Sequence, residues 1–188
     1  MADSDVKLDL PTRVLHAGVA VLGVWAWWIG EDAGDYHKPV HPNFTLHEYV
    51  GLAFTAVLAL RLLYGFFGPK ALRFSVWLPY TRERWATVTA DLRTLSRFRV
   101  PEPRVHRGLN ALVQGLGLLL FTWQAACGTV LSIYIVPGQR ATGWLHSLKE
   151  LHQLASVWIP TYLVLHIGAT ALHALTGRQI WKKMVFME

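Results

Sequence analysis

Two histidines, His152 and His166, stand inside one long apolar stretch in the C-terminal quarter of the sequence. If the stretch is one α-helix, their separation of 14 residues places both imidazoles within about 40° of a single face and about 21 Å apart along the axis. An ionisable side chain is costly inside a membrane, so its presence there marks a functional site. The spacing therefore predicts two sites stacked along one face of a membrane helix.

The elements that must position these histidines are four apolar blocks, each long enough to cross a membrane. Hydrophobic residues make up 53% of the 188 residues and charged residues only 16%, and nine tryptophans supply the aromatic side chains typical of membrane interfaces. The apolar residues do not follow the period of an amphipathic helix. The sequence predicts an all-α, integral membrane four-helix bundle in a single domain, 1–188, with helices over about 12–30, 47–67, 105–136 and 147–175.

The positions of the cations explain the formal net charge of +6. Most of the 18 Lys and Arg fall in the N-terminal tail, between Lys70 and Arg107, and in the C-terminal tail, three regions that share one side if four helices alternate. The positive-inside rule then predicts that both termini and the long middle segment between the second and third helices are cytoplasmic. The excess of positive charge is thus a topology signal: membrane lipid is an expected partner, and nucleic acid is not.

The alternating topology also assigns a depth to four histidines. His16 lies at the inner edge of the first helix, and His47 opens the second helix at the outer edge. The fourth helix begins outside, so His152 lies near the outer edge and His166 near the inner edge of a hydrocarbon core about 30 Å thick. These residues form two pairs at two depths, His16 with His166 inside and His47 with His152 outside.

Pairs of imidazoles at two depths suit bis-histidine haem ligation, with one ring on each side of each iron. The single cysteine, Cys127, cannot form a Cys-x-x-Cys-His motif, so two haem b groups would be held non-covalently. Filled axial positions favour electron transfer over substrate binding at the iron. Three alternatives stay open: zinc, which usually takes three or four ligands at one point, a proton relay, and structural histidines.

Arg61 follows His47 by 14 residues and therefore lies at about the depth of His166. An arginine at this depth needs an anion, which a haem propionate would provide, or its side chain reaches the inner headgroups. Gly51, one turn after His47, leaves room beside the imidazole. On the third helix, Gln124 either lines a pocket or satisfies its neighbours.

Two connecting segments carry further signals. The segment over about 81–98 predicts a cytoplasmic amphipathic helix on the inner leaflet rather than a partner-binding site, because its apolar residues recur at helical spacing beside arginines. These apolar residues are Trp85, Val88, Leu92 and Leu95. In the first outer loop, His37 and His41 have the spacing of a metal pair, but Pro39 between them favours a solvated loop over a zinc site.

Several stretches resemble the prokaryotic cytochrome b561 and hydrogenase-type dihaem cytochrome b family. They are Asp9-Leu-Pro-Thr-Arg-Val-Leu-His16, His47-Glu-Tyr-Val-Gly51, Leu60-Arg61-Leu, Leu151-His152-Gln and Leu165-His166-Ile-Gly-Ala. The resemblance covers nearly the whole chain and implies the same pairing, inner with inner and outer with outer. Ala17 departs from the family pattern, which usually has an aromatic residue there, so the resemblance does not extend to the potential of the inner haem.

The resemblance implies transmembrane electron transfer between the quinone pool and a partner on one side. The partner would be a periplasmic redox protein such as a c-type cytochrome, or the other subunits of a quinone-linked oxidoreductase; a homodimer is left open. The alternative is a self-contained membrane oxidoreductase that acts on a small species such as superoxide or ferric iron with quinone. Because the sequence has no flavin, nicotinamide or iron–sulfur motif, we favour the electron-transfer protein or subunit.

A quinone site is implied by the resemblance, and the residues offer two sets of candidates for it. Charged side chains at helix ends are commonly plain interfacial anchors, which is the competing interpretation of both sets. The inner candidates are Arg104, His106 and Arg107, and the outer candidates are Glu48, His146 and Glu150.

Overall fold

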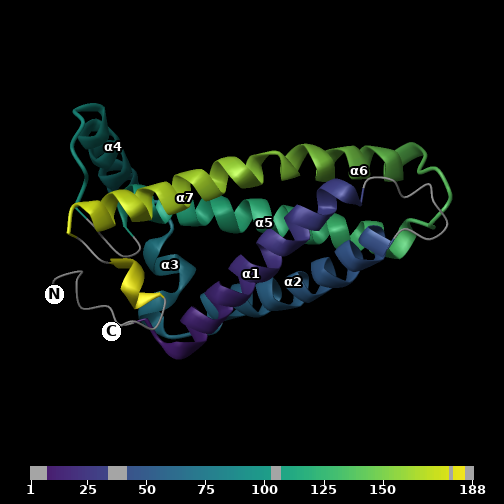
Figure 1. Ribbon diagram of the computed structural model, residues 1–188. Coiled ribbons are helices and arrows are strands. Elements are labelled where there is room, and N and C mark those ends of the chain that lie inside the picture. Colours follow the sequence, from purple (N-terminus) through teal and green to yellow (C-terminus); the bar gives the residue numbers. More distant parts are fainter. Residues whose placement is uncertain (1–7, 34–41, 103–106, 178–179, 185–188) are drawn as a thin grey trace. The chain divides into compact units, whose positions relative to one another are not determined.

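In a computed structural model, residues 8–33, 42–102, 107–177 and 180–184 are described, and every regular element among them is a helix (Figure 1). The long helices are α1 (Leu10–Asp32), α2 (Pro42–Phe67), α5 (Gly108–Tyr134), α6 (Gly143–Ser156) and α7 (Trp158–Leu175). Four stretches are long and apolar enough to cross a membrane: Leu10–Glu31, Asn43–Phe67, Gly108–Tyr134 and Gly143–Leu175. The prediction of an all-α chain with four apolar spans is confirmed.

The fourth span is divided into two helices, where the sequence predicted one unbroken helix over 147–175. Val157 alone separates the end of α6 at Ser156 from the start of α7 at Trp158. Pro160 explains the break, because proline has no N–H to donate to the carbonyl four residues earlier, that of Ser156, and its ring clashes with that carbonyl. The prediction of one unbroken helix is therefore wrong at Val157, between His152 and His166, and the placement of these two rings on one helical face stays untested.

The chain divides into two compact units, which are described separately. Unit 1 comprises Met1–Arg13, Leu62–Leu118 and Thr161–Glu188, and unit 2 comprises Val14–Arg61 and Leu119–Pro160. Unit 2 therefore contains a part of each of the four spans. Its core includes Phe54 of α2 and Phe121 of α5, whose rings meet edge to face with centroids 5.7 Å apart.

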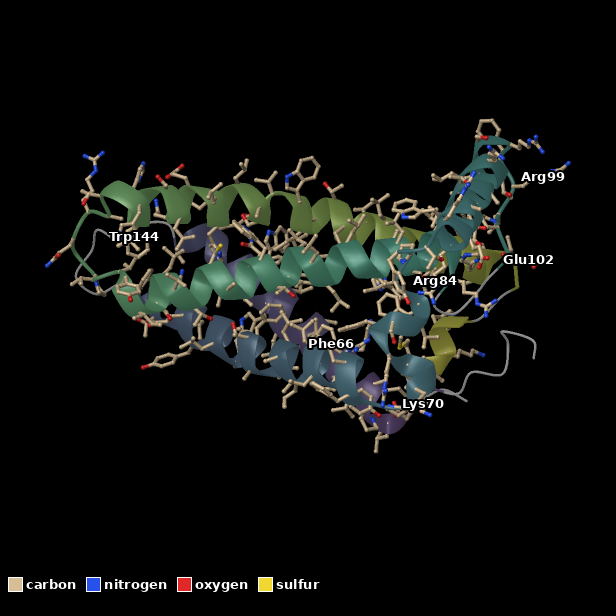
Figure 2. The ribbon with its side chains drawn as sticks, turned by 180° about the vertical axis from the view of Figure 1, so that it is seen from behind. Phe66, Lys70, Arg84, Arg99, Glu102 and Trp144 are labelled. Atoms are coloured by element: carbon tan, nitrogen blue, oxygen red, sulfur yellow. The ribbon has the colours of Figure 1, made fainter. Side chains whose placement is uncertain are left out.

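Unit 1 is built around the short helix α3 (Phe74–Trp77). Phe74 and Trp77 are buried together with Ala111 of α5, and the ring of Phe74 lies where a side chain on Gly65 of α2 would be. Phe66, labelled in Figure 2, packs edge to face on Phe74 with centroids 5.0 Å apart. The 3₁₀ turns η2 (Lys70–Leu72) and η3 (Ile180–Lys183) also belong to this unit.

Helix α4 (Arg82–Ser96) belongs to unit 1, is capped at its start and is held to its neighbours by residues in its middle. Thr81 caps its start, because the Thr81 hydroxyl accepts a hydrogen bond from the Arg84 N–H at 3.4 Å. Val88 is fully buried, and the carboxylate of buried Asp91 accepts a hydrogen bond from the Leu109 N–H at 2.9 Å. Asp91 thereby caps the first turn of α5 from another helix and fixes α4 to the beginning of the third span.

We expect the Asp91→Leu substitution to lower the free energy of unfolding by about 1 to 3 kcal/mol, because the Leu109 N–H would lose its acceptor inside the protein. Thermal unfolding of the purified protein in detergent measures this change. Thr89→Ala is the matched control, since Thr89 is exposed on the same helix and should change stability little. Equal midpoints for Asp91→Leu and the control would show that the cap does not stabilise unit 1.

A second polar contact in unit 1 joins the entrance of α1 to the end of α2. The Asp9 carboxylate accepts hydrogen bonds from the Thr12 N–H at 3.1 Å and from the Tyr64 hydroxyl. Burial alone would raise the pKa of the Asp9 carboxyl, but the hydrogen bonds from Thr12 and Tyr64 outweigh burial and hold the pKa below its usual value of 3.8. Ionised Asp9 therefore stabilises the folded state.

A lowered pKa contributes stability that is present above the usual value of 3.8 and is lost as the pH falls through the folded pKa. We expect Tyr64→Phe to remove one of these hydrogen bonds and to unfold at a lower temperature than the wild type at neutral pH. The difference should narrow as the pH falls below the usual value, because Asp9 becomes protonated in both proteins. Thermal midpoints measured across this range test the prediction, and a difference independent of pH would contradict it.

Candidate functional site

The structure brings His47 and His152 together within unit 2. The two imidazole rings, from α2 and α6, have centroids 6.2 Å apart and planes inclined at 71°. His16 also belongs to unit 2, whereas His166 belongs to unit 1, so the inner pair stays a prediction. The role of Arg61 beside a propionate likewise stays a prediction.

The ring of His47 is fixed by a third helix. Its Nδ1 lies 2.9 Å from the carbonyl oxygen of Ala26 on α1. A carbonyl only accepts hydrogen bonds, so Nδ1 carries the proton and, in the neutral ring, Nε2 keeps the lone pair that can bind a metal. Gly30 is required beside this ring, because a Cβ at that position would lie 2.9 Å from His47 Cε1.

The side chain of His152 is half-buried, and its Nδ1 atom is fully buried. Among the residues that the structure describes, its Nδ1 has no hydrogen-bond partner. A buried polar atom without a partner costs about 1 to 3 kcal/mol, so such atoms mark positions where a ligand or water is expected. Gly128 of α5 lies beside this ring, and a Cβ there would be in van der Waals contact with His152 Cε1 at 3.4 Å.

Both rings face a cavity of about 300 Å³ that is formed entirely by unit 2. A side chain on Gly51 would meet no atom within 4 Å, which shows open space beside α2. Most of the lining is apolar, and it comes from all four spans. The apolar contacts include Ala26, Phe54, Phe121, Ala125, Leu131 and Ile159.

Polar and charged residues also line the cavity, although they contribute less of its surface than the apolar residues. Gln124 of α5 is buried, and its Oε1 has no hydrogen-bond partner among the described residues. Glu31, Glu48 and Lys149 also line the cavity, and the Lys149 side chain is only 19% exposed. An apolar cavity with a few polar groups is the usual composition of a cofactor site.

These features fit a bis-histidine haem better than a zinc ion. Within the described part of the chain, no three His, Cys, Asp or Glu side chains gather around one point, as a zinc site would require. Metal–nitrogen bonds of about 2 Å on both sides, with half a ring added to each, separate two axial imidazole centroids by roughly 6 Å. The observed centroid separation of 6.2 Å is close to this value.

A family model described as prokaryotic cytochrome b561 matches residues 7–187. The chain belongs to the prokaryotic cytochrome b561 family. It is therefore a haem-binding membrane protein of electron transfer, and the family implies haem b as its cofactor. The chain matches no curated protein and no solved structure.

In this cytochrome b561 family member, the proposed inner ligand His166 is supported by an aromatic stack within unit 1. The ring of Tyr162, one turn earlier on α7, lies parallel to His166 with centroids 5.5 Å apart and an angle of 14°. Tyr162 in turn fills the space over Gly117 of α5, where a Cβ would lie 2.3 Å from the Tyr162 ring. The stack and the glycine together limit the orientation of the His166 ring.

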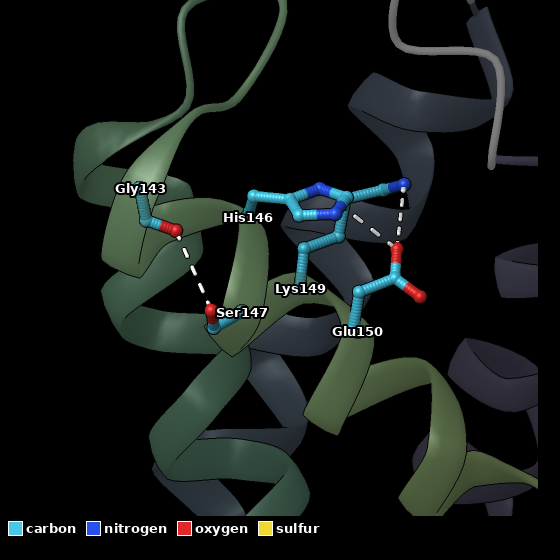
Figure 3. A network of polar contacts seen from close by, with 5 residues as sticks. All are labelled: Gly143, His146, Ser147, Lys149 and Glu150. Atoms are coloured by element: carbon cyan, nitrogen blue, oxygen red, sulfur yellow. Dashed lines mark hydrogen bonds and ion pairs between the residues drawn. The ribbon is translucent and has the colours of Figure 1, made fainter.

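The candidate quinone residues lie in different surroundings in the structure. On α6, His146 and Glu150 lie on the exposed surface, with His146 Nδ1 4.0 Å from a Glu150 oxygen and Lys149 Nζ 3.9 Å from the same oxygen (Figure 3). Glu48, by contrast, lines the cavity. Arg107 belongs to unit 1, and the other two inner candidates, Arg104 and His106, lie outside the described residues. The loop pair His37 and His41, weighed above as a metal pair, also lies outside them.

Sequence reasoning missed three contributors to the outer site: the Ala26 carbonyl, Gly30 and Gly128. A backbone carbonyl has no signature in the sequence. The two glycines look like other small residues of membrane helices until the helix that each one faces is known.

Proposed function

We propose that this chain is a dihaem cytochrome b that carries electrons across the bacterial inner membrane. It would connect the quinone pool to a periplasmic redox partner, such as a c-type cytochrome, or to the other subunits of an oxidoreductase. The observation that carries the proposal is the pair His47 and His152 facing one apolar cavity, in a chain of the cytochrome b561 family.

The proposed ligands are His47 and His152 for an outer haem and His16 and His166 for an inner haem. The outer pair is supported by the 6.2 Å separation of the rings and by the Nδ1 of His152, which the described residues leave without a partner. The inner pair rests on the depth argument and on the family resemblance. Arg61 is the proposed partner of an inner propionate, and the positive-inside rule supports cytoplasmic termini.

The residues of unit 2 would hold the cofactor and keep water away from it. When bound, haem supplies a one-electron redox couple between two axial imidazoles. The Ala26 carbonyl keeps the His47 proton on Nδ1 and so presents Nε2 as the ligand atom. The glycines at 30 and 51 keep space open, while the apolar lining lowers the local dielectric and excludes water.

The pyridine haemochrome assay on the purified full chain tests the proposal, followed by reduction with a quinol and addition of an oxidised c-type cytochrome. We expect two haem b groups per chain, both reduced by quinol, and reoxidised rapidly by the protein partner. One haem or none would contradict the two-haem assignment. Steady consumption of superoxide or ferric iron by the isolated chain would instead favour a self-contained oxidoreductase.

A further inference from the structure

The turn that follows α4 exposes an aromatic side chain in a strained conformation. Phe98 is 100% exposed, and its φ angle of 55° lies in the left-handed region that normally favours glycine. Hydrogen bonds from the Phe98 N–H to the Leu95 carbonyl, at 2.9 Å, and from the Arg99 N–H to the Thr94 carbonyl, at 3.1 Å, hold this turn. A bulky apolar residue in such a turn suggests a function outside the fold.

Helix α4 and the turn after it, residues Arg82–Arg99, form an arm that is attached to the start of the third span. Asp91 binds α4 to Leu109 in the first turn of α5, and α5 is a candidate membrane span that begins at Gly108. Within unit 1, Figures 1 and 2 show α4 projecting away from the start of α5, with Arg99 near its far end. The arm therefore begins at the level where the third span leaves the membrane.

The exposed surface of the arm combines apolar and basic residues. Trp85 and Leu92 are 47% and 48% exposed, and their spacing of seven residues places them two turns apart on one face. The stretch Arg82–Arg99 contains five arginines against two acidic residues, of which Asp91 is buried against α5. The exposed arginines are Arg82, Arg93, Arg97 and Arg99.

We propose that α4 and the turn Arg97–Arg99 bind the headgroups of anionic lipids, with Phe98 inserted among them. Charge complementarity supports this partner, because basic residues beside Trp, Phe and Leu are typical of helices that lie on anionic membranes. The start of α5, to which Asp91 binds α4, is also the start of a candidate membrane span. The proposal concerns lipid selectivity and holds whichever electron partner the protein has.

A fluorescent reporter at the turn tests the proposal in the full-length protein. The variant Phe98→Cys, made with Cys127→Ala, is labelled with an environment-sensitive dye and placed in nanodiscs of phosphatidylcholine with or without phosphatidylglycerol. We expect a blue-shifted emission and at least twofold stronger quenching by headgroup-level spin-labelled lipid in the anionic discs. Ala90→Cys is the control, because Ala90 is exposed about 140° around the helix from Trp85.

A companion variant tests whether the arginine charges are needed for the side chain at position 98 to enter the lipid headgroups. Replacing Arg97 and Arg99 with Ser should abolish the difference between anionic and neutral discs. If the label at 98 is quenched by aqueous iodide as strongly as the label at 90 in both discs, the turn lies in water and the proposal is wrong. Equal shielding in both discs, or shielding that depends on protein concentration instead of lipid, would also overturn it.

Discussion

Replacing His152 with Ala is expected to halve the low-spin haem signal of the purified protein and to leave the other haem in place. The His152 imidazole is one of two imidazoles among the described residues that line the unit 2 cavity, and no other described His, Cys, Asp or Glu joins them in a group of three. Because alanine leaves a hole of about the size of the ring, added imidazole should restore part of the signal. Optical and electron paramagnetic resonance spectra of the reduced and oxidised protein measure both effects.

His146→Ala is the matched control for His152→Ala. His146 lies on the same helix, α6, but its side chain is exposed and pairs with Glu150 at 4.0 Å on the surface. His47→Ala should remove the same spectral component as His152→Ala. If His47→Ala and His152→Ala remove different spectral components, or if neither removes one, these two residues do not bind the same haem.

Gly117→Ala is expected to alter the other haem component and to leave the His47–His152 component unchanged. The new Cβ would lie 2.3 Å from the Tyr162 ring, so Tyr162 must move, and its parallel stack on His166 would be broken. A changed orientation of an axial imidazole changes the g-values of a low-spin haem and shifts its midpoint potential. Electron paramagnetic resonance with a redox titration checks this prediction independently of turnover.

Gly115→Ala serves as the control on the same helix. Its Cβ would meet Leu78 Cδ2 at 2.8 Å, the end of a flexible side chain that can move aside. Tyr162→Phe should keep the stack and hence the spectrum. If Gly117→Ala and Gly115→Ala have the same spectra as the wild type, Tyr162 does not position the inner ligand.

The four spans could be predicted from the sequence because hydropathy is a property of each helix alone. Residues such as Trp25, Trp27 and Trp28 or the run Leu118–Phe121 indicate a membrane environment without any knowledge of the neighbours. The proximity of His47 and His152 could also be predicted from the sequence, because the alternating direction of the helices places both residues near the same edge of the membrane. The family resemblance was confirmed by a match over residues 7–187.

Contacts between helices could not be predicted in the same way. The Ala26 carbonyl, the space beside Gly30 and the cap from Asp91 to Leu109 depend on which faces meet, and one sequence does not contain that information. Pro160 is a local signal for the break at Val157, because proline removes a backbone hydrogen bond. Hydropathy does not register this loss, since the residues on both sides of the break are apolar. His16 with His166 stays a prediction, because its two members belong to different units.

The outer site takes its parts from distant points of the chain, and this sets an order of events during biosynthesis. Ala26, His47 and His152 come from three helices, and the two histidines are 105 residues apart (152 minus 47). At a synthesis rate of about 5 to 20 residues per second, the second imidazole leaves the ribosome roughly 5 to 20 s after the first. If haem binds between these two imidazoles, as we propose, both ligands are present only after α6 has been synthesised, so the complete site forms late in the synthesis of the chain.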